Sequence, residues 1–393
     1  MIDRVFPAPS IDPLTRLHVY DGLMMNADRW LLAEQYHRRR QNVHYQSLHQ
    51  PGVVCGLGVK QISPPNTAPE RFRDRRWLEV QPGIAIDMEG NPIIVDRPLT
   101  YRVATEPPAT GSVTVYLLIS YVEPDNPPYQ QEAATIQEQF RLDETTKPPG
   151  DRQIELCRIK LQPETVAFKP AKNAFVPEAN ELDFRYRNQA QAKPQGLVRV
   201  AVLRDGDTGF SDRISDLLYL LQSLEALYPS LQGIPVELSQ LRSPLLPFDL
   251  LYLTGWQLLN FNIGALELLR HGLEAGSTVL VEVSDRSVNL DHVQSTLQQL
   301  QPSLHSWKNL DQNPSLRILK TQPFLFSALP ISQQPMQLWA GNGVVLVAGE
   351  LSRAWGLNEN LNFARHEIRT AQELGVNILN FAWRRQQLMQ LSQ

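Results

Sequence analysis

The side chains best placed for chemistry lie in three loops of the second half of the chain. These loops follow predicted strands and read Asp205-Gly206-Asp207, Thr254-Gly255-Trp256 and Glu282-Val283-Ser284-Asp285. In an open α/β sheet, ligands and catalytic groups gather at the carboxyl ends of the strands. Asp207, Glu282 and Asp285 would place carboxylates there, for acid and base chemistry or for binding a small polar ligand such as a sugar. Ordinary solvated loops contain the same residues, and this is the explanation we favour.

Other residue types that perform chemistry lack the spacing it requires. The serine elbow G-x-S-x-G is absent, and no histidine pair has the H-x-x-x-H spacing of a helical zinc site. His366 and Glu367 are neighbours in a predicted helix, so they point about 100° apart and do not form an oriented dyad. Gly56-Leu57-Gly58 and Gly341-Asn342-Gly343 do not continue into a phosphate-binding loop. We therefore nominate no catalytic, cofactor-binding or metal-binding residue, and expect no enzyme activity.

Composition limits the class of protein. With 393 residues, 42% of them hydrophobic, the chain is long enough for two domains with separate cores. A net charge of -4 provides no cationic excess for a phosphate backbone, so no nucleic-acid partner is expected. Cys55 and Cys157 are far apart, which favours reduced and buried thiols. Neither a signal peptide nor a run of ~18 apolar residues occurs, and we expect a cytoplasmic, soluble protein.

One helix is predicted in the first half, over residues 26–43. Leu32, Tyr36 and Val43 share a face at helical spacing. The three arginines at 38–40 are expected near the C-terminal end of this helix, where cations suit the helix dipole, and a solvated face is their expected role.

From residue 49 the hydrophobic period changes to two, which predicts half-buried strands. Glu89-Gly90-Asn91 predicts a hairpin turn, because glycine accepts a positive φ without a Cβ penalty. Further strands are predicted at residues 113–121 and 154–161. Residues 123–150 between them are polar and rich in proline, which predicts a long loop or arm.

Residues 162–196 are again polar and interrupted by prolines, and we place the domain boundary near Pro194-Gln195-Gly196. The predicted fold class is therefore an α+β module rich in β-strands over residues 1–195, followed by a second domain over residues 196–393.

Strands and amphipathic helices alternate in the second domain. Ser211 is the predicted N-cap of one helix, and Gly276 is predicted to end another over residues 265–275. Strands are expected at residues 198–203, 236–238, 248–253 and 278–283. Because these runs are apolar on both faces, they predict a parallel sheet covered by helices.

The C-terminal region continues the same alternation. Gly341-Asn342-Gly343 predicts a hairpin turn before a strand at residues 344–348. Residues 360–374 are predicted to be helical, with Gly375 ending the helix and residues 378–381 forming a last strand. A three-layer α/β domain results.

Four ordered stretches of the first domain resemble a known family. They are Tyr20 to Met25 with Gln35 to Arg40, Gly52 to Val59, Val80 to Asp87, and Gly90 to Ile93. Together they are similar to the N-terminal module of proteins encoded with phage-tail-like contractile injection systems. The resemblance implies a structural part of the baseplate or its surroundings, and it implies no catalytic residue.

The second domain resembles an uncharacterised family with a class I glutamine-amidotransferase-like, flavodoxin-like fold. The similar stretches are residues 248–255, 273–280 and 374–378. Amidotransferases of this fold place a cysteine after the strand that corresponds to residues 278–282, and here Val283 and Ser284 stand there. The H-x-E partner is missing as well, so the resemblance implies the fold without the amidase activity.

These observations favour a structural protein of the baseplate region of a bacterial contractile injection system. Its expected partners are other baseplate and tail proteins, in several copies within a symmetric assembly, with residues 123–150 and 162–194 as arms. Its expected location is the cytoplasm, within the assembled particle, and attachment to a membrane through other components stays open. Two alternatives remain: a sugar-type binding or hydrolytic unit that uses Asp207, Glu282 and Asp285, and a free scaffold unrelated to injection machinery.

Overall fold

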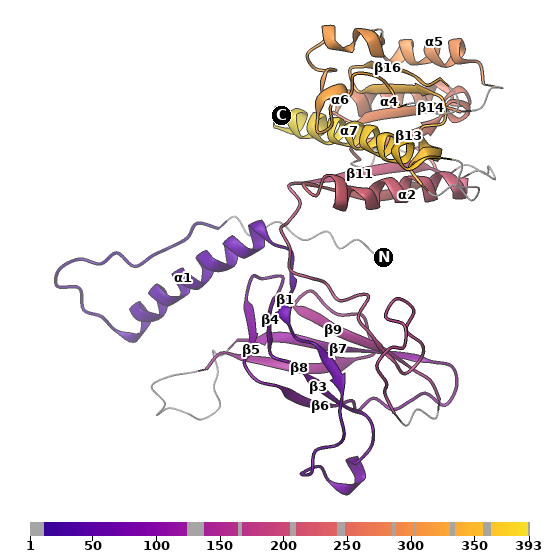
Figure 1. The fold of residues 1–393 in the computed structure, drawn as a ribbon. Coiled ribbons are helices and arrows are strands. Elements are labelled where there is room, and N and C mark those ends of the chain that lie inside the picture. The colour runs from indigo at the N-terminus through magenta and orange to yellow at the C-terminus, as the bar shows by residue number, and fades with distance from the viewer. Residues whose placement is uncertain are drawn as a thin grey trace. The chain divides into compact units, whose positions relative to one another are not determined.

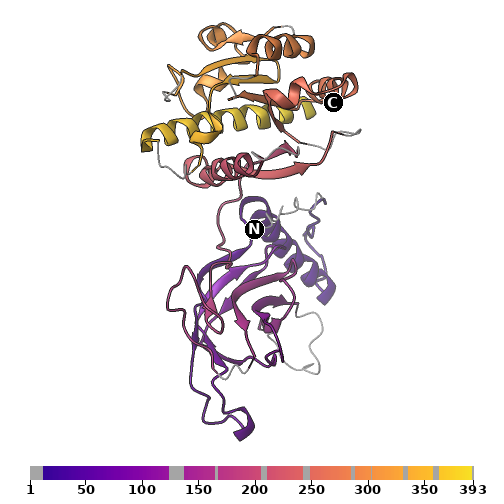
Figure 2. The same ribbon diagram turned by 90° about the vertical axis from the view of Figure 1, so that its right-hand side faces the viewer.

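A computed structural model describes residues 12–123, 137–163, 167–204, 210–241, 248–284, 288–301, 303–330, 335–356 and 363–391, with the backbone alone at 210–212. The chain divides into two compact units, Met1–Lys193 and Pro194–Gln393. Figures 1 and 2 show a β-rich first unit and a layered second unit. The sequence places the boundary beside this division, between residues 195 and 196. Among the described residues, no helix is long and apolar enough to cross a membrane.

Unit 1 is built from three antiparallel sheets around one core. The first has the order β1 (Gly52–Gly56), β4 (Gly83–Ile86) and β5 (Pro92–Val95). The second has the order β2 (Val59–Gln61), β3 (Trp77–Val80) and β6 (Leu99–Arg102), and a short 3-10 helix, η1 (Glu70–Phe72), precedes β3. The third has the order β10 (Leu182–Asp183), β9 (Gln153–Leu161), β7 (Val113–Val122) and β8 (Gln139–Thr145). Side chains of all three sheets meet in a single apolar cluster, which holds the unit together.

The predicted hairpin at Glu89-Gly90-Asn91 is present between β4 and β5. Gly90 has a φ of +82°, and a Cβ there would lie 2.6 Å from the carbonyl oxygen of Asn42. Asp87 accepts the backbone N–H of Asn91 at 2.8 Å and its side-chain amide at 3.0 Å, which closes the turn. The turn chemistry of the sequence is therefore used as expected.

The expected loop at 123–150 is wrong in its second part. Gln139–Thr145 forms β8, which pairs antiparallel with β7 from Tyr116↔Thr145 to Val122↔Gln139. β8 lies at the sheet edge, where its residues alternate between exposed and half-buried, none of them is fully buried, and its composition is polar. Residues 124–136 of the predicted arm lie outside the described residues.

Residues 167–193 belong to unit 1, and several of them bond to its strands, contrary to the expected arm. Backbone hydrogen bonds join Val53 to Asn188 and Ala190, at 2.9 Å each. Arg187 donates to the carbonyl oxygens of Gly56 and Leu57. The prolines of this segment lie in irregular backbone, and neighbouring strands provide hydrogen-bond partners for its N–H and C=O groups.

Helix α1 (Ala27–Leu48) is longer than predicted and none of its residues is buried. Asn26 is its N-cap and accepts the backbone N–H of Arg29 at 3.0 Å. Because the helix continues to Leu48, the three arginines at 38–40 lie in its middle and not in its last turn. The dipole argument for them is therefore wrong.

Unit 2 has a seven-stranded mixed sheet with the order β12-β11-β13-β14-β17-β16-β15. The strands β11 (Gly196–Leu203), β12 (Leu231–Leu238), β13 (Leu250–Thr254), β14 (Thr278–Val283) and β17 (Val344–Ala348) are parallel. β16 (Gln337–Gly341) runs antiparallel to β17 and to β15 (His305–Ser306). The coarse prediction of an α/β domain is confirmed, and the predicted turn at Gly341-Asn342-Gly343 joins β16 to β17.

Helices cover both faces of this sheet. One cluster joins one strand face to α2 (Phe210–Leu227), α6 (Ile318–Thr321), α7 (Arg365–Gln390) and the 3-10 helices η2 (Trp307–Gln312) and η3 (Ser352–Ala354). The opposite cluster joins the other face to α3 (Gly255–Leu259), α4 (Ile263–Glu274) and α5 (Leu290–Leu300). Alternate residues of β11 enter opposite clusters, Val200 and Val202 the first and Ala201 and Leu203 the second. Helix α2 begins at Phe210, one residue before the predicted N-cap.

The predicted strand at 378–381 is wrong, because α7 runs without interruption from Arg365 to Gln390. Gly375 lies inside this helix, where its missing Cβ lets α2 approach: a Cβ would lie 2.6 Å from Leu220 Cδ1. Residues 374–382 are all buried, since α7 packs between α2, α6 and the sheet. A segment buried all round has no solvent-exposed face, so its hydrophobic period does not distinguish a helix from a strand.

Candidate functional site

The carboxyl edge of the unit 2 sheet is the first candidate site, and Glu282 at the end of β14 is buried there. One carboxylate oxygen accepts the hydroxyl of Tyr252 from β13. The other accepts the backbone N–H of Ser352 at 2.9 Å, from η3. Burial raises the pKa of Glu282, and the hydrogen bonds from Tyr252 and Ser352 lower it in part. Glu282 therefore ties two strands to η3 and presents no free carboxylate to a ligand.

Thr254, the last residue of β13, and Gln257 in α3 also have structural roles. Thr254 Oγ1 accepts the backbone N–H of Gln257 at 3.2 Å, and Gln257 Oε1 accepts that of Thr254 at 2.9 Å. The Gln257 amide donates to the carbonyl oxygen of Leu203 on β11 at 3.0 Å. This reciprocal capping starts α3 directly at the strand end. Trp256 stays 55% exposed.

The remaining predicted residues are not brought together. Asp207 and Asp285 lie outside the described residues, and Ser284 is exposed. Of the three carboxylates in the sugar-site alternative, the one that the structure describes, Glu282, is buried and occupied, and this corrects its expected role.

At the start of α7, Glu367 accepts the backbone N–H of Ala364 at 2.6 Å as a helix cap, while His366 is exposed. The described part of the chain contains no group of three or more histidine, cysteine and carboxylate residues that could hold a metal ion. Cys157 is buried, and burial raises the pKa of its thiol, but Cys55 is exposed, contrary to the expectation for both cysteines.

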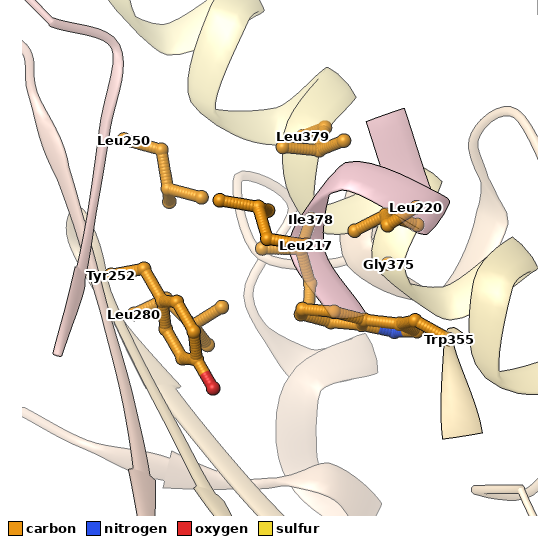
Figure 3. Close-up of a pocket in the computed structure, with 9 residues that line it drawn as sticks. All are labelled: Leu217, Leu220, Leu250, Tyr252, Leu280, Trp355, Gly375, Ile378 and Leu379. Atoms are coloured by element: carbon orange, nitrogen blue, oxygen red, sulfur yellow. The ribbon is translucent and has the colours of Figure 1, made fainter. Parts of the chain in front are cut away.

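An apolar void lies between α2, α7 and the sheet, and it is too small for a ligand (Figure 3). Its volume is about 10 Å³, and it is lined by leucine and isoleucine side chains together with Tyr252, Trp355 and Gly375. The Tyr252 hydroxyl points to Glu282, and the Trp355 indole N–H donates to the carbonyl oxygen of Ala371 at 3.1 Å. The void has barely the volume of one water molecule and lacks polar partners for it.

Unit 1 has a larger, polar hollow of about 190 Å³ beside β9 and β10. Arg158 lines this hollow and donates to both carboxylate oxygens of Glu155, at 2.6 and 2.8 Å. Its guanidinium group also stacks on Tyr186, 3.6 Å from the ring centroid. Arg185 is held by Asp183 in the same two-pronged way, at 3.0 and 2.9 Å. Both guanidinium groups are therefore already paired with carboxylates of their own unit.

Exposed apolar side chains provide the strongest interaction surface. A long exposed series precedes and begins α1: Val19 (69%), Tyr20 (59%), Met24 (78%), Met25 (38%), Trp30 (65%) and Leu31 (48%). We call residues 19–48, which include all of α1, the α1 arm. Tryptophan, tyrosine and methionine are the types enriched in protein interfaces. Sequence reasoning missed this surface because it assigned the apolar residues of the helix to a buried face, whereas Trp30 and Leu31 lie outside that face.

Comparisons with known proteins add little. No family model matches the chain, and no curated protein matches it. Two solved structures are similar at 12% identity and a TM-score of 0.25: TssK, and the baseplate complex from the type VI secretion system. Each alignment covers 82% of this chain, with 65% of the TssK chain and 94% of the baseplate chain. The chain thus spans about two thirds of TssK, and a TM-score this low carries no argument about function.

Proposed function

We propose that the chain is a non-catalytic structural component of the baseplate region of a bacterial contractile injection system, which acts through protein interfaces. Its partners in this proposal are other baseplate and tail proteins, and its place is the cytoplasm, within the assembled particle. The proposal rests on the resemblance of the first domain to modules encoded with such systems.

The observation that carries the proposal is that the resembling stretches form one local structure. Gly52 to Val59, Val80 to Asp87 and Gly90 to Ile93 contribute the three neighbouring strands β1, β4 and β5. A Cβ on Gly83 would lie 2.3 Å from the carbonyl oxygen of Cys55, so this spacing of glycines allows the close approach of β1 and β4. The resembling stretches are therefore tertiary neighbours, which supports their assignment to one structural module.

The state of the chemical candidates also supports an interface role. Glu282, Thr254 and Glu367 each hold backbone groups of their own unit in place. The α1 arm exposes apolar side chains of the kind that form the energetic centre of interfaces. Binding of proteins is thus better supported than turnover of a small substrate.

Purification of contractile particles tests the proposal. Particles from a strain that carries a tagged copy should contain the chain in constant ratio to sheath and tube proteins through a density gradient. Particles from a deletion strain should show an incomplete baseplate by electron microscopy. Complete particles that lack the chain would contradict the proposal.

The alternative of a sugar-type site is tested separately by thermal shift. A ligand at 100 times its Kd stabilises the folded state by about 2.7 kcal/mol. We expect no shift with sugars, nucleotides or amino acids. A shift that disappears in a Glu282→Gln variant would favour the alternative instead.

A further inference from the structure

The first half of α1 leaves apolar side chains exposed, whereas its second half is bonded to the body of unit 1. None of the residues of α1 is buried, and its hydrogen bonds to the body of unit 1 come from its second half. Asn42 bonds to Asn91 at 2.9 Å, and Gln46 donates to the carbonyl oxygen of Glu89 at 2.7 Å. Figure 1 shows the first half standing away from the sheets of unit 1. Helices in proteins gain most of their stability from tertiary packing, so the exposed side chains of the first half offer a surface for a partner.

One side of α1, exposed except at the half-buried Arg38 and Tyr45, has the spacing of a two-helix seam. Met24 precedes the helix, and the seam positions then alternate at intervals of four and three residues: Ala27, Leu31, Glu34, Arg38, Gln41, Tyr45 and Leu48. This alternation is the a and d pattern of a coiled coil. Met24, Leu31 and Leu48 are 78%, 48% and 51% exposed. The seam thus has apolar ends and a charged centre.

The charges of the centre decide which helix fits. In an antiparallel pair of two copies, Glu34 of each copy lies opposite Arg38 of the other, which makes two ion pairs across a two-fold axis near residue 36. The same register places Leu31 opposite Gln41, Ala27 opposite Tyr45 and Met24 opposite Leu48. A parallel pair would place Glu34 against Glu34 and Arg38 against Arg38, and like charges in contact are unfavourable.

Glu34 is exposed and makes no hydrogen bond or ion pair with the described residues. Arg38 forms an ion pair with Glu123 of its own unit. The side chains of Arg38 and Glu123 are 39% and 41% exposed. Arg38 also hydrogen-bonds Tyr121 of β7. Because an ion pair as exposed as the one with Glu123 contributes little, Arg38 can exchange that carboxylate for Glu34 of a second copy.

From this complementarity we infer that the α1 arm is a self-association surface, whose occupant is the α1 arm of a second copy of this chain in an antiparallel, two-fold pair. Such an interface uses the same patch on both copies. The inference concerns the purified chain and stands independently of the larger assembly in which the chain is proposed to act.

Charge reversal tests the register. Sedimentation velocity of the full chain, from about 1 to about 100 μM at low salt, should show a monomer–dimer equilibrium that weakens as salt screens the ion pairs. Glu34→Arg and Arg38→Glu should each raise the dimer dissociation constant at least tenfold (about 1.4 kcal/mol). An equimolar mixture of the two variants should form dimers again, because each copy then faces a complementary charge.

Two controls separate this interface from other effects. Arg40→Glu reverses a charge on the other side of α1 and should leave the dimer unchanged. Glu123→Gln removes the contact of Arg38 within its own unit and should also leave it unchanged. Far-UV circular dichroism should give the same helix content in every variant at a concentration where all are monomeric.

Three results would overturn the inference. They are a wild-type chain that stays monomeric throughout the concentration range, dimers that persist in both charge-reversal variants, and variants that fail to pair when mixed. The last two would locate any self-association elsewhere on the chain, and the first would leave a different protein as the occupant of the arm.

Discussion

At the scale of single residues, the molecule uses its buried polar side chains to hold distant backbone segments together. Asn377 on α7 is fully buried, and its amide oxygen accepts the backbone N–H of Phe324 at 2.9 Å. Its amide nitrogen donates to the carbonyl oxygens of Leu319 and Phe324, at 2.9 and 2.7 Å. Glu282 acts in the same way between β14 and η3. In both cases a single side chain satisfies backbone groups that would otherwise be buried without partners.

Glu282 gives a prediction about pH. Burial raises its pKa in the folded state above the ordinary value of 4.5, so the folded chain holds this proton more strongly than the unfolded chain does. Its contribution to stability is therefore fully present below about pH 4.5 and is lost as the pH rises through the raised pKa. A Glu282→Gln variant cannot ionise, and its amide can still accept from Ser352 and donate to Tyr252. Relative to wild type, this variant should become more stable as the pH rises.

Urea unfolding of both proteins between about pH 4.5 and pH 8 measures this difference. Glu350→Gln is the matched control, because that carboxylate lies nearby but is partly exposed and pairs with Arg353 at 3.0 Å. Equal pH dependence for wild type, Glu282→Gln and the control would show that Glu282 does not carry the effect.

At the scale of elements, close packing of α7 decides the architecture of one face of unit 2. The helix passes α2 at Gly375, where a Cβ would lie 2.6 Å from Leu220 and 3.0 Å from the indole nitrogen of Trp355. The Trp355 indole N–H is itself bonded to α7, at the carbonyl oxygen of Ala371. A glycine that looks like the end of a helix in the sequence is thus the point where two helices and a tryptophan meet.

A larger residue at this crossing should destabilise unit 2. Gly375→Val adds three carbons where there is no space, and overpacking of this kind costs about 2 kcal/mol. The free energy of unfolding from urea titration should fall by this amount. Gly264→Ala is the control, because on α4 a Cβ meets only the Asn262 side chain at 3.5 Å, and alanine favours a helix by up to about 1 kcal/mol. An unchanged stability for Gly375→Val would show that α2 and α7 separate easily.

At the scale of the whole molecule, the chain consists of two units that each bury their own core. The core of unit 1 is one cluster shared by three sheets, and that of unit 2 is two clusters on opposite faces of one sheet. The division falls between Lys193 and Pro194. Each unit has the size of an ordinary independent domain.

Separate folding of the two units is therefore expected. A chain cleaved by an engineered protease site between residues 193 and 194 should give two fragments, each with cooperative thermal unfolding. Their melting temperatures should match two transitions of the intact chain within a few degrees, by circular dichroism and calorimetry. Loss of cooperative unfolding in either fragment would show that its core depends on the other.

The sequence by itself determined the local features of this protein. Three kinds of local feature were predictable: turn glycines such as Gly90 and Gly343, the strand at residues 278–283, and the change of hydrophobic pattern near Gly196. Each depends on the conformational preference or hydrophobic period of adjacent residues. The lack of a nucleophile beside a base could also be proposed from residue types alone.

Only the tertiary structure decided what those residues contact. Residues 374–382 continue α7, which packs against α2, α6 and the sheet, and residues 139–145 form β8 by pairing with the edge of β7. Glu282 is not available to a ligand, because η3, which is distant in sequence, covers its carboxylate. The exposed seam of α1 likewise depends on where the body of unit 1 ends. Hydrophobic period records local preference, whereas burial depends on which distant segment arrives, and no single stretch of sequence contains that information.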